Sequence, residues 1–249
     1  SRTPACLQMC PFKALSVAGS NTETALETVT LPHAPEVIDV PPADSFRRPP
    51  RLSLAIRGVG GQGNLFFGKV LAQVAFLAGY DDRNILKGET HGMAQMGGPV
   101  ISTFGCGEVF SPALVPGTAN VLIAMEKAEV LRPGFLDLLE PGGTVLMADT
   151  RILPHGLKPE AYPSDEAIAA QLEGYRVVSV DVLSIALNLG DPKGRCANVA
   201  MLGVLSTLPP FDVVPEAVWL QALRGISRKP ALWDLNHAAF MAGRGMQKG

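Results

Sequence analysis

Cysteine is scarce in this sequence, which has four cysteines among 249 residues. So few cysteines cannot form a disulfide framework for a chain of this length, and we expect a reducing, cytoplasmic setting. Charge is scarce too, because Asp, Glu, Lys and Arg make up 18% of the residues and the formal net charge is -2. Such a chain lacks the basic surface that attracts nucleic acids or anionic membranes, so neither partner is expected.

Long hydrophobic runs are lacking as well. No stretch approaches the roughly 18 uninterrupted apolar residues of a transmembrane helix, and the sequence does not open on a signal-peptide pattern, so no membrane span is expected. Apolar residues are nevertheless abundant, at 47% with a mean hydropathy of +0.21. This value is high for a soluble monomer and favours a core plus a sizeable buried interface, as in an obligate subunit.

The first fifty residues differ in composition from the rest. Residues 18–50 are rich in proline and small polar residues and keep no helical or strand period, which predicts an extended linker, wrapped over a surface or running between modules. Residues 1–17 would then be a short separate module. The periodic sequence over residues 51–249 predicts one large domain.

Strand and helix patterns alternate from residue 51 onward. Short apolar runs predict strands at residues 52–59, 99–107, 120–125, 142–150 and 175–182. Longer apolar patterns predict helices at residues 64–79, 182–190, 196–208, 215–226 and 231–246. Pro133 should split residues 127–139 into two helical pieces. The order predicts an α/β fold with a mostly parallel, Rossmann-like sheet flanked by helices.

A glycine-rich turn follows the first predicted strand. Gly58, Gly60 and Gly63 satisfy the pattern G-x-G-x-x-G where a strand gives way to a helix. Glycine allows a tight turn and lets free amides at the helix N-terminus face an anion, so the motif predicts a phosphate site or a purely structural turn. A dinucleotide site also needs an acidic residue after the second strand, whereas Asp81 and Asp82 directly follow the first helix, which disfavours NAD.

A second glycine-bearing segment lies at residues 88–102. Glu89, His91 and Gln95 supply side chains that form specific hydrogen bonds. Four glycines lie among them: Gly88, Gly92, Gly97 and Gly98. This combination favours a binding loop, and a plain surface loop is the alternative.

Four stretches, taken in order, resemble one family. They are "GVGGQG" before a buried helix, "ETHGMAQMGGPVIS", "IAMEKAEVLR" and "NVAMLGVL". Together they are similar to the γ-type subunits of the 2-oxoacid:ferredoxin oxidoreductases, and closest to the smaller subunit of indolepyruvate oxidoreductase. The resemblance covers residue 51 to the C-terminus. It implies a complex that decarboxylates a 2-oxoacid on thiamine diphosphate with Mg²⁺, sends electrons through 4Fe-4S clusters to ferredoxin, and transfers the acyl group to coenzyme A (CoA).

The resemblance also implies which residues form a site. The turn would face a CoA phosphate through Gly58, Gly60, Gly61, Gln62 and Gly63. The second segment would line the approach of CoA or substrate through Glu89, His91, Gln95, Gly97 and Gly98. No catalytic residue is expected on this chain, because it has no thiamine motif of the G-D-G type and no nucleophile with a nearby base.

The N-terminal segment carries a cysteine pattern of its own. Cys6 and Cys10 form C-x-x-x-C-P, which resembles the closing half of a ferredoxin-type 4Fe-4S motif. Two cysteines cannot hold such a cluster, so we expect the other two ligands to precede this sequence in a fusion or a larger polypeptide. A chance pair of cysteines is the alternative. Cys106 and Cys196 are predicted to be core thiols.

These observations predict a subunit that helps to hold CoA and to assemble the complex, with thiamine-binding subunits and ferredoxin or a similar acceptor as partners. Two other functions remain open. One is a nicotinamide-dependent dehydrogenase domain, and the other is a non-catalytic scaffold that docks an iron–sulfur module.

Overall fold

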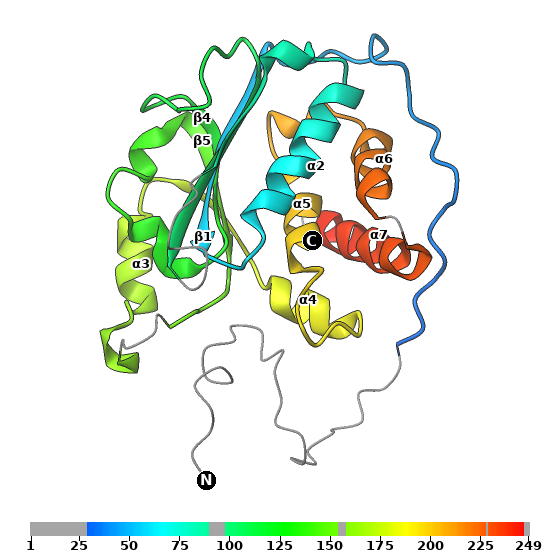
Figure 1. Ribbon diagram of the computed structural model, residues 1–249. Helices are drawn as coiled ribbons and strands as arrows, with labels where there is room; N and C mark the ends of the chain where they lie inside the picture. Colours follow the sequence, from blue (N-terminus) through cyan, green and yellow to red (C-terminus); the bar gives the residue numbers. More distant parts are fainter. Residues whose placement is uncertain (1–28, 90–97, 154–157, 228, 247–249) are drawn as a thin grey trace.

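A single six-stranded sheet forms the centre of the molecule. The computed structural model describes residues 29–89, 98–153, 158–227 and 229–246 (Figure 1). Along the sheet the strand order is β2-β3-β1-β4-β5-β6. The strands are β1 (Arg51–Val59), β2 (Ile85–Glu89), β3 (Pro99–Gly107), β4 (Ala119–Ala124), β5 (Leu139–Ala148) and β6 (Arg176–Val180).

The sheet is mostly parallel. Strands β1, β4, β5 and β6 pair in parallel, whereas β3 is antiparallel to both β1 and β2. Strand β2 therefore runs in the same direction as β1, and β3 is the single reversed strand of the sheet. The predicted α/β fold class is confirmed.

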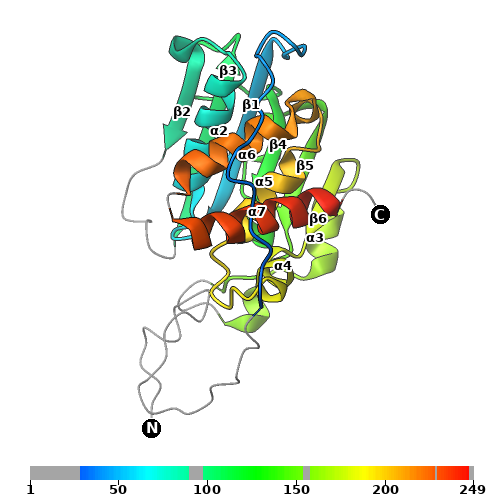
Figure 2. The same cartoon turned by 90° about the vertical axis from the view of Figure 1, so that its right-hand side faces the viewer.

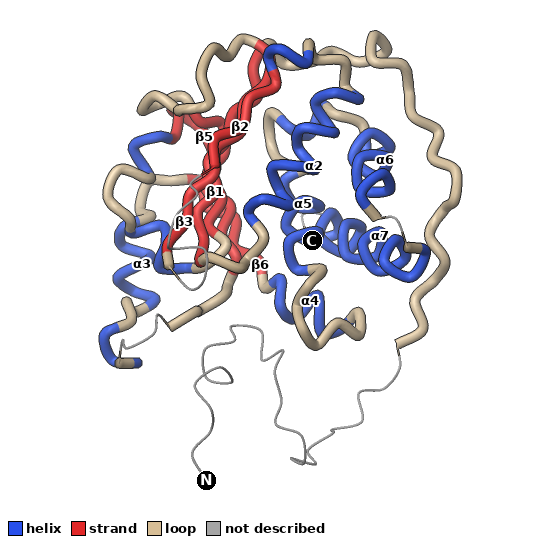
Figure 3. The backbone as a smooth tube through the Cα atoms, viewed as in Figure 1, coloured by secondary structure: helices blue, strands red, loops and turns tan. Residues whose placement is uncertain are grey.

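Helices cover both faces of the sheet, as Figures 1 and 3 show. One face carries α2 (Asn64–Leu77), α4 (Val182–Asn188), α5 (Ala197–Leu205), α6 (Glu216–Ile226) and α7 (Pro230–Gly245). The other face carries α3 (Asp165–Gln171) and two 3-10 helices, η3 (Lys127–Leu131) and η4 (Leu136–Leu138). Further 3-10 helices are η1 (Asp82–Asn84), η5 (Pro159–Ala161) and η6 (Phe211–Val213).

Strand β1 lies between two apolar cores. Leu54 and Ile56 are buried against the helical layer of α2 and α5, and Ala55 is buried against the layer of η3, η4 and α3. Such burial on both faces explains why this strand, like β4, is a nearly continuous apolar run. It also fixes where β1 ends and the glycine turn begins.

Helices α5 and α7 pack at backbone contact. A Cβ atom on Gly203 would overlap the carbonyl oxygen of Phe240, and one on Gly243 would overlap that of Ala200. Only glycine permits this approach, which holds α5 firmly in the layer behind the turn.

The sequence patterns predicted most elements, but they did not predict β2 or α3. Residues 127–139 form two separate 3-10 helices, η3 and η4, on either side of Pro133, as predicted. Ser164 is the N-cap of helix α3, and its hydroxyl accepts a hydrogen bond from the amide of Ala167. That N-cap stabilises a helix of only 7 residues.

The described part of the predicted linker, residues 29–50, lies across the helical layer. Figure 2 shows it crossing the outer side of α7 and α6 on its way to β1. The amide of Ala34 donates to Asp234 Oδ1 at 2.8 Å, and the hydroxyl of Tyr80 donates to the carbonyl of Pro49 at 2.7 Å. This stretch is therefore bound to the domain over its length.

Candidate functional site

The glycine turn lies at the carboxyl end of β1, where it opens α2. The amide of Gln62 donates to the carbonyl of Val59 at 3.0 Å, which closes the turn. Gly61 and Gly63 have φ angles of 102° and 85°, in the left-handed region that favours glycine. Gly63 is the N-cap of α2, and its carbonyl accepts from the amides of Phe66 and Phe67.

The two glycine-bearing segments of the sequence meet at this turn. The amide of Gly60 donates to the carbonyl of Gly98 at 2.8 Å, and Val59 pairs with Pro99 across β1 and β3. Strand β2 ends nearby at Glu89, whose carboxylate lies 3.5 Å from Lys87 Nζ, on the side of α2. His91, Gln95 and Gly97 lie outside the described residues.

Gln62 closes the gap between the ends of β1 and β4. Its side chain is 5% exposed; Oε1 accepts from the amide of Val59 and Nε2 donates to the carbonyl of Met125, each at 2.7 Å. In a Rossmann fold the pyrophosphate of a dinucleotide lies at this switch point of the sheet. A ligand in front of the turn would here meet backbone atoms of Gln62, because its side chain is bonded inside the protein.

Asn198, near the start of α5, holds the turn from the helical layer. Its Nδ2 donates to the carbonyl of Gln62 at 2.5 Å, and a Cβ atom on Gly63 would overlap the Asn198 side chain. This contact fixes the peptide unit between Gln62 and Gly63. Asn198 belongs to one of the stretches that carry the family resemblance, but no sequence pattern predicted its contact with the turn.

The start of α2 presents several free donors. The backbone N–H groups of Gly61, Gly63, Asn64 and Leu65 have no acceptor among the described residues. Free amides at a helix N-terminus, together with the helix dipole, form a place where an anion binds. Gly61 is exposed, Leu65 is 48% exposed and Gly63 is partly exposed, whereas Asn64 is 6% exposed.

A second polar group lies at the carboxyl end of β4, on the opposite face of the sheet. Glu126 is 2% exposed; it accepts hydrogen bonds from the hydroxyl of Tyr162 and, at 3.3 Å, from the amide of Ile152. Burial raises the pKa of Glu126, and the bond from Tyr162 opposes that shift. Glu129 is also buried and forms ion pairs with Arg132 at 2.9 Å and Arg57 at 3.5 Å. These carboxylates tie loops to the sheet.

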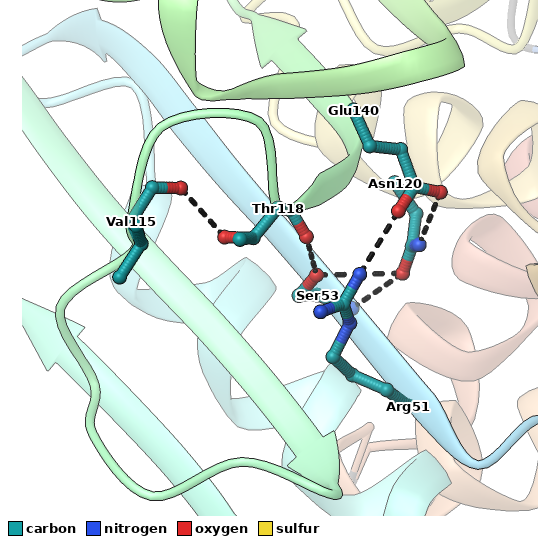
Figure 4. A network of polar contacts seen from close by, with 6 residues as sticks. All are labelled: Arg51, Ser53, Val115, Thr118, Asn120 and Glu140. Carbon is teal, nitrogen blue, oxygen red and sulfur yellow. Dashed lines mark hydrogen bonds and ion pairs between the residues drawn. The ribbon is translucent and has the colours of Figure 1, made fainter.

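A cavity of about 450 Å³ lies at the other end of the sheet. There Arg51 pairs with Glu140 at 2.9 Å, and Asn120 bonds both Glu140 and the amide of Ser53 (Figure 4). β1 has 9 residues from Arg51 to Val59, so the two ends are roughly 26 Å apart at about 3.3 Å per residue. The polar groups of this network already bond one another, whereas the donors at the turn are free.

No group of three or more His, Cys, Asp or Glu side chains that could hold a metal occurs in the described ranges. Cys106 and Cys196 are buried and free, as predicted, and burial raises the pKa of each thiol to about 12. Cys6 and Cys10 lie outside the described residues.

Within the part of the chain that the structure covers, no helix is long and apolar enough to span a membrane.

Residues 53–246 match the protein family described as pyruvate ferredoxin/flavodoxin oxidoreductase. The chain belongs to this family. Two family relatives are described as indolepyruvate oxidoreductase subunit IorB. The one from Archaeoglobus fulgidus is 35% identical over 62% of this chain and 76% of its own length. The one from Thermococcus kodakarensis is 33% identical over 77% of this chain and 93% of its own length.

Solved structures of this oxidoreductase family share the fold. Pyruvate oxidoreductase subunit PORC from Thermotoga maritima gives a TM-score of 0.56 at 20% identity, covering 79% of this chain and 97% of that chain. A second structure is a 2-oxoglutarate:ferredoxin oxidoreductase from Magnetococcus marinus, solved with 2-oxoglutarate, coenzyme A and succinyl-CoA bound. It gives a TM-score of 0.58 at 19% identity, and the match covers 81% of this chain and 32% of that chain. At these identities the likeness concerns the fold alone.

Proposed function

We propose that this chain is the γ-type subunit, or domain, of a 2-oxoacid:ferredoxin oxidoreductase, and that its glycine turn binds a phosphate of CoA. One observation carries the proposal: four backbone amides at the start of α2 have no acceptor among the described residues, in a member of the pyruvate ferredoxin/flavodoxin oxidoreductase family. The Magnetococcus relative was solved with coenzyme A bound, which supports CoA as the ligand class. An aryl-pyruvate-like 2-oxoacid fits the IorB relatives.

The backbone of the glycine turn would form the contacts with the phosphate. The amides of Gly61, Gly63 and Asn64 would donate to phosphate oxygens, and the dipole of α2 favours the negative charge. Gln62 and Asn198 hold the turn in place before the ligand arrives, so little ordering would accompany binding. CoA accepts the acyl group through its thiol at the far end of the molecule. The reacting end would therefore extend toward the catalytic partner subunits.

Catalysis is proposed to lie on those partner subunits. Thiamine diphosphate with Mg²⁺ and the 4Fe-4S clusters need carboxylate and thiolate ligand sets, and the described residues hold no such set. Cys6 and Cys10 remain candidates for half of one cluster site. The dehydrogenase alternative is disfavoured because the Gln62 side chain fills the space between β1 and β4.

The test replaces Gly61 by alanine in the assembled complex. A Cβ atom at Gly61 would touch nothing within 4 Å, but its φ of +102° disfavours alanine, so the turn would distort without a steric clash. A strain of about 1–2 kcal/mol corresponds to a rise of about tenfold in the KM for CoA. Gly174→Ala is the matched control, because Gly174 has a φ of +84° and equally open space before β6. Equal KM values for both variants would refute the proposed site.

A further inference from the structure

The described residues of the glycine turn itself, 58–65, include no Lys or Arg. The free donors there are neutral amides, the neighbouring Gln62 and Asn64 side chains are uncharged, and Glu89 at the end of β2 forms an ion pair with Lys87 at 3.5 Å. Phosphate sites in proteins usually add Lys or Arg to such amides, because charge-assisted hydrogen bonds are about twice as strong as neutral ones. A ligand with several phosphates needs cations from another part of the chain.

The loop that leads into α5 carries two such cations, Lys193 and Arg195. Both residues are exposed. Arg195 precedes Asn198 by three residues, just before the start of α5, and Asn198 bonds directly to the glycine turn at 2.5 Å. Figure 1 shows α5 beside α2 in the same helical layer. The start of α5, and with it the end of this loop, therefore lies next to the turn.

Arg195 is held so that its outer edge stays free. Asp191 is 1% exposed, and its carboxylate accepts from the amide of Cys196 at 2.9 Å and from Arg195 Nε at 3.2 Å. A buried carboxylate needs such partners, and Arg195 is the one cation bonded to it among the described residues. The Arg195 side chain is 70% exposed, and its two terminal nitrogens have no partner within the described ranges. A guanidinium edge of this kind can bind a phosphate with two parallel hydrogen bonds.

We propose that Lys193 and Arg195 form the cationic wall of a phosphate site whose neutral floor is the glycine turn, with Asp191 as a positioning residue for Arg195. The ligand class is the phosphorylated nucleotide end of CoA, and the inference rests on the proposed function. The competing interpretation is that Asp191 caps α5 and that Arg195 is an ordinary surface partner of Asp191.

The experiment measures the Kd of CoA and of 3′-dephospho-CoA by calorimetry on the assembled complex. Arg195→Gln keeps a hydrogen-bonding side chain beside Asp191 but removes the charge, and Lys193→Ala removes an exposed amine. We expect Arg195→Gln to weaken CoA binding about tenfold or more and Lys193→Ala by several-fold, and both variants to reduce the salt dependence of binding. Arg47→Ala is the matched control, an exposed arginine that precedes β1 at the other end of the sheet.

The two ligands locate the contact. If the variants lose affinity for CoA alone, Lys193 and Arg195 contact the 3′-phosphate. If they lose affinity equally for both ligands, the two cations contact the diphosphate. Either result supports the cationic wall. If Gly61→Ala weakens binding while Arg195→Gln and Lys193→Ala stay within twofold of the parent, the cationic wall is refuted and the glycine turn stands. If none of the variants changes the affinity, the proposed function itself fails.

Discussion

Replacing Gln62 by leucine tests the clamp that joins the ends of β1 and β4. Leucine nearly keeps the volume but removes both hydrogen bonds of the buried amide, leaving the N–H of Val59 and the carbonyl of Met125 unpaired. Each buried group left without a partner costs about 1–3 kcal/mol, so the local free energy of opening should fall by about 2–6 kcal/mol. Gln73→Leu on the exposed side of α2 is the matched control and should change it by less than about 0.5 kcal/mol.

The assay is amide hydrogen exchange of residues 57–66 in the assembled complex without ligand. At the lower limit of 2 kcal/mol, exchange at the turn should become about 30-fold faster in Gln62→Leu. The amides of α7 should be unaffected in the same sample, since they belong to a separate part of the layer. Exchange at the turn that matches the Gln73→Leu control would refute the argument that Gln62 holds the two strand ends together.

Three further predictions concern other parts of the chain. Gly243→Ala drives a methyl group into the carbonyl of Ala200 and should destabilise the chain by about 1–3 kcal/mol in thermal denaturation, whereas Gly245→Ala on the same helix meets open space and should be nearly neutral. Burial raises the pKa of Glu126 above its ordinary 4.5, so the folded chain holds this proton more tightly than the unfolded chain does. The stability of the fold should therefore fall as pH rises from about 4.5 through the raised pKa. Glu126→Gln should flatten that part of the profile of Tm against pH, and an unchanged profile would contradict this prediction. Cys10→Ser, in a longer polypeptide that carries the other two ligands, should lower the iron content per chain with the α/β domain intact; equal iron would show that the pair is no ligand set.

Hydrophobic periodicity predicted the main elements because β1, β4 and α5 are buried on nearly all sides, so their apolar runs are long and clear. Helix α2 was expected to be buried all round, but Leu65 and Phe76 on its outer side are exposed. Strand β2 escaped prediction because it is a short edge strand, "ILKGE", with a lysine and a glycine inside it. Helix α3 has 7 residues and one buried apolar side chain, too little to show a period. The reversal of β3 depends on pairing partners, which periodicity does not encode.

The glycines of the site could be predicted from the sequence, but the side chains that hold the turn in place could not. The G-x-G-x-x-G spacing located the turn and the start of α2, because glycine at positive φ is a local requirement. The supports join distant residues: Gln62 bonds to Met125, 63 positions away, and Asn198 bonds to Gln62 over 136 positions. The spacing of one sequence carries no sign of such pairs, so the inward direction of the Gln62 side chain became visible only in the fold.

Amide hydrogen exchange of the assembled complex, with and without saturating CoA, shows whether the glycine turn binds CoA. We expect slower exchange on CoA addition at the free amides of Gly61, Gly63 and Asn64, because each would gain a phosphate oxygen as acceptor. Residues 140–143, which line the cavity at the other end of the sheet, should exchange as before. Unchanged exchange at the turn, or protection confined to the distant cavity, would contradict the account.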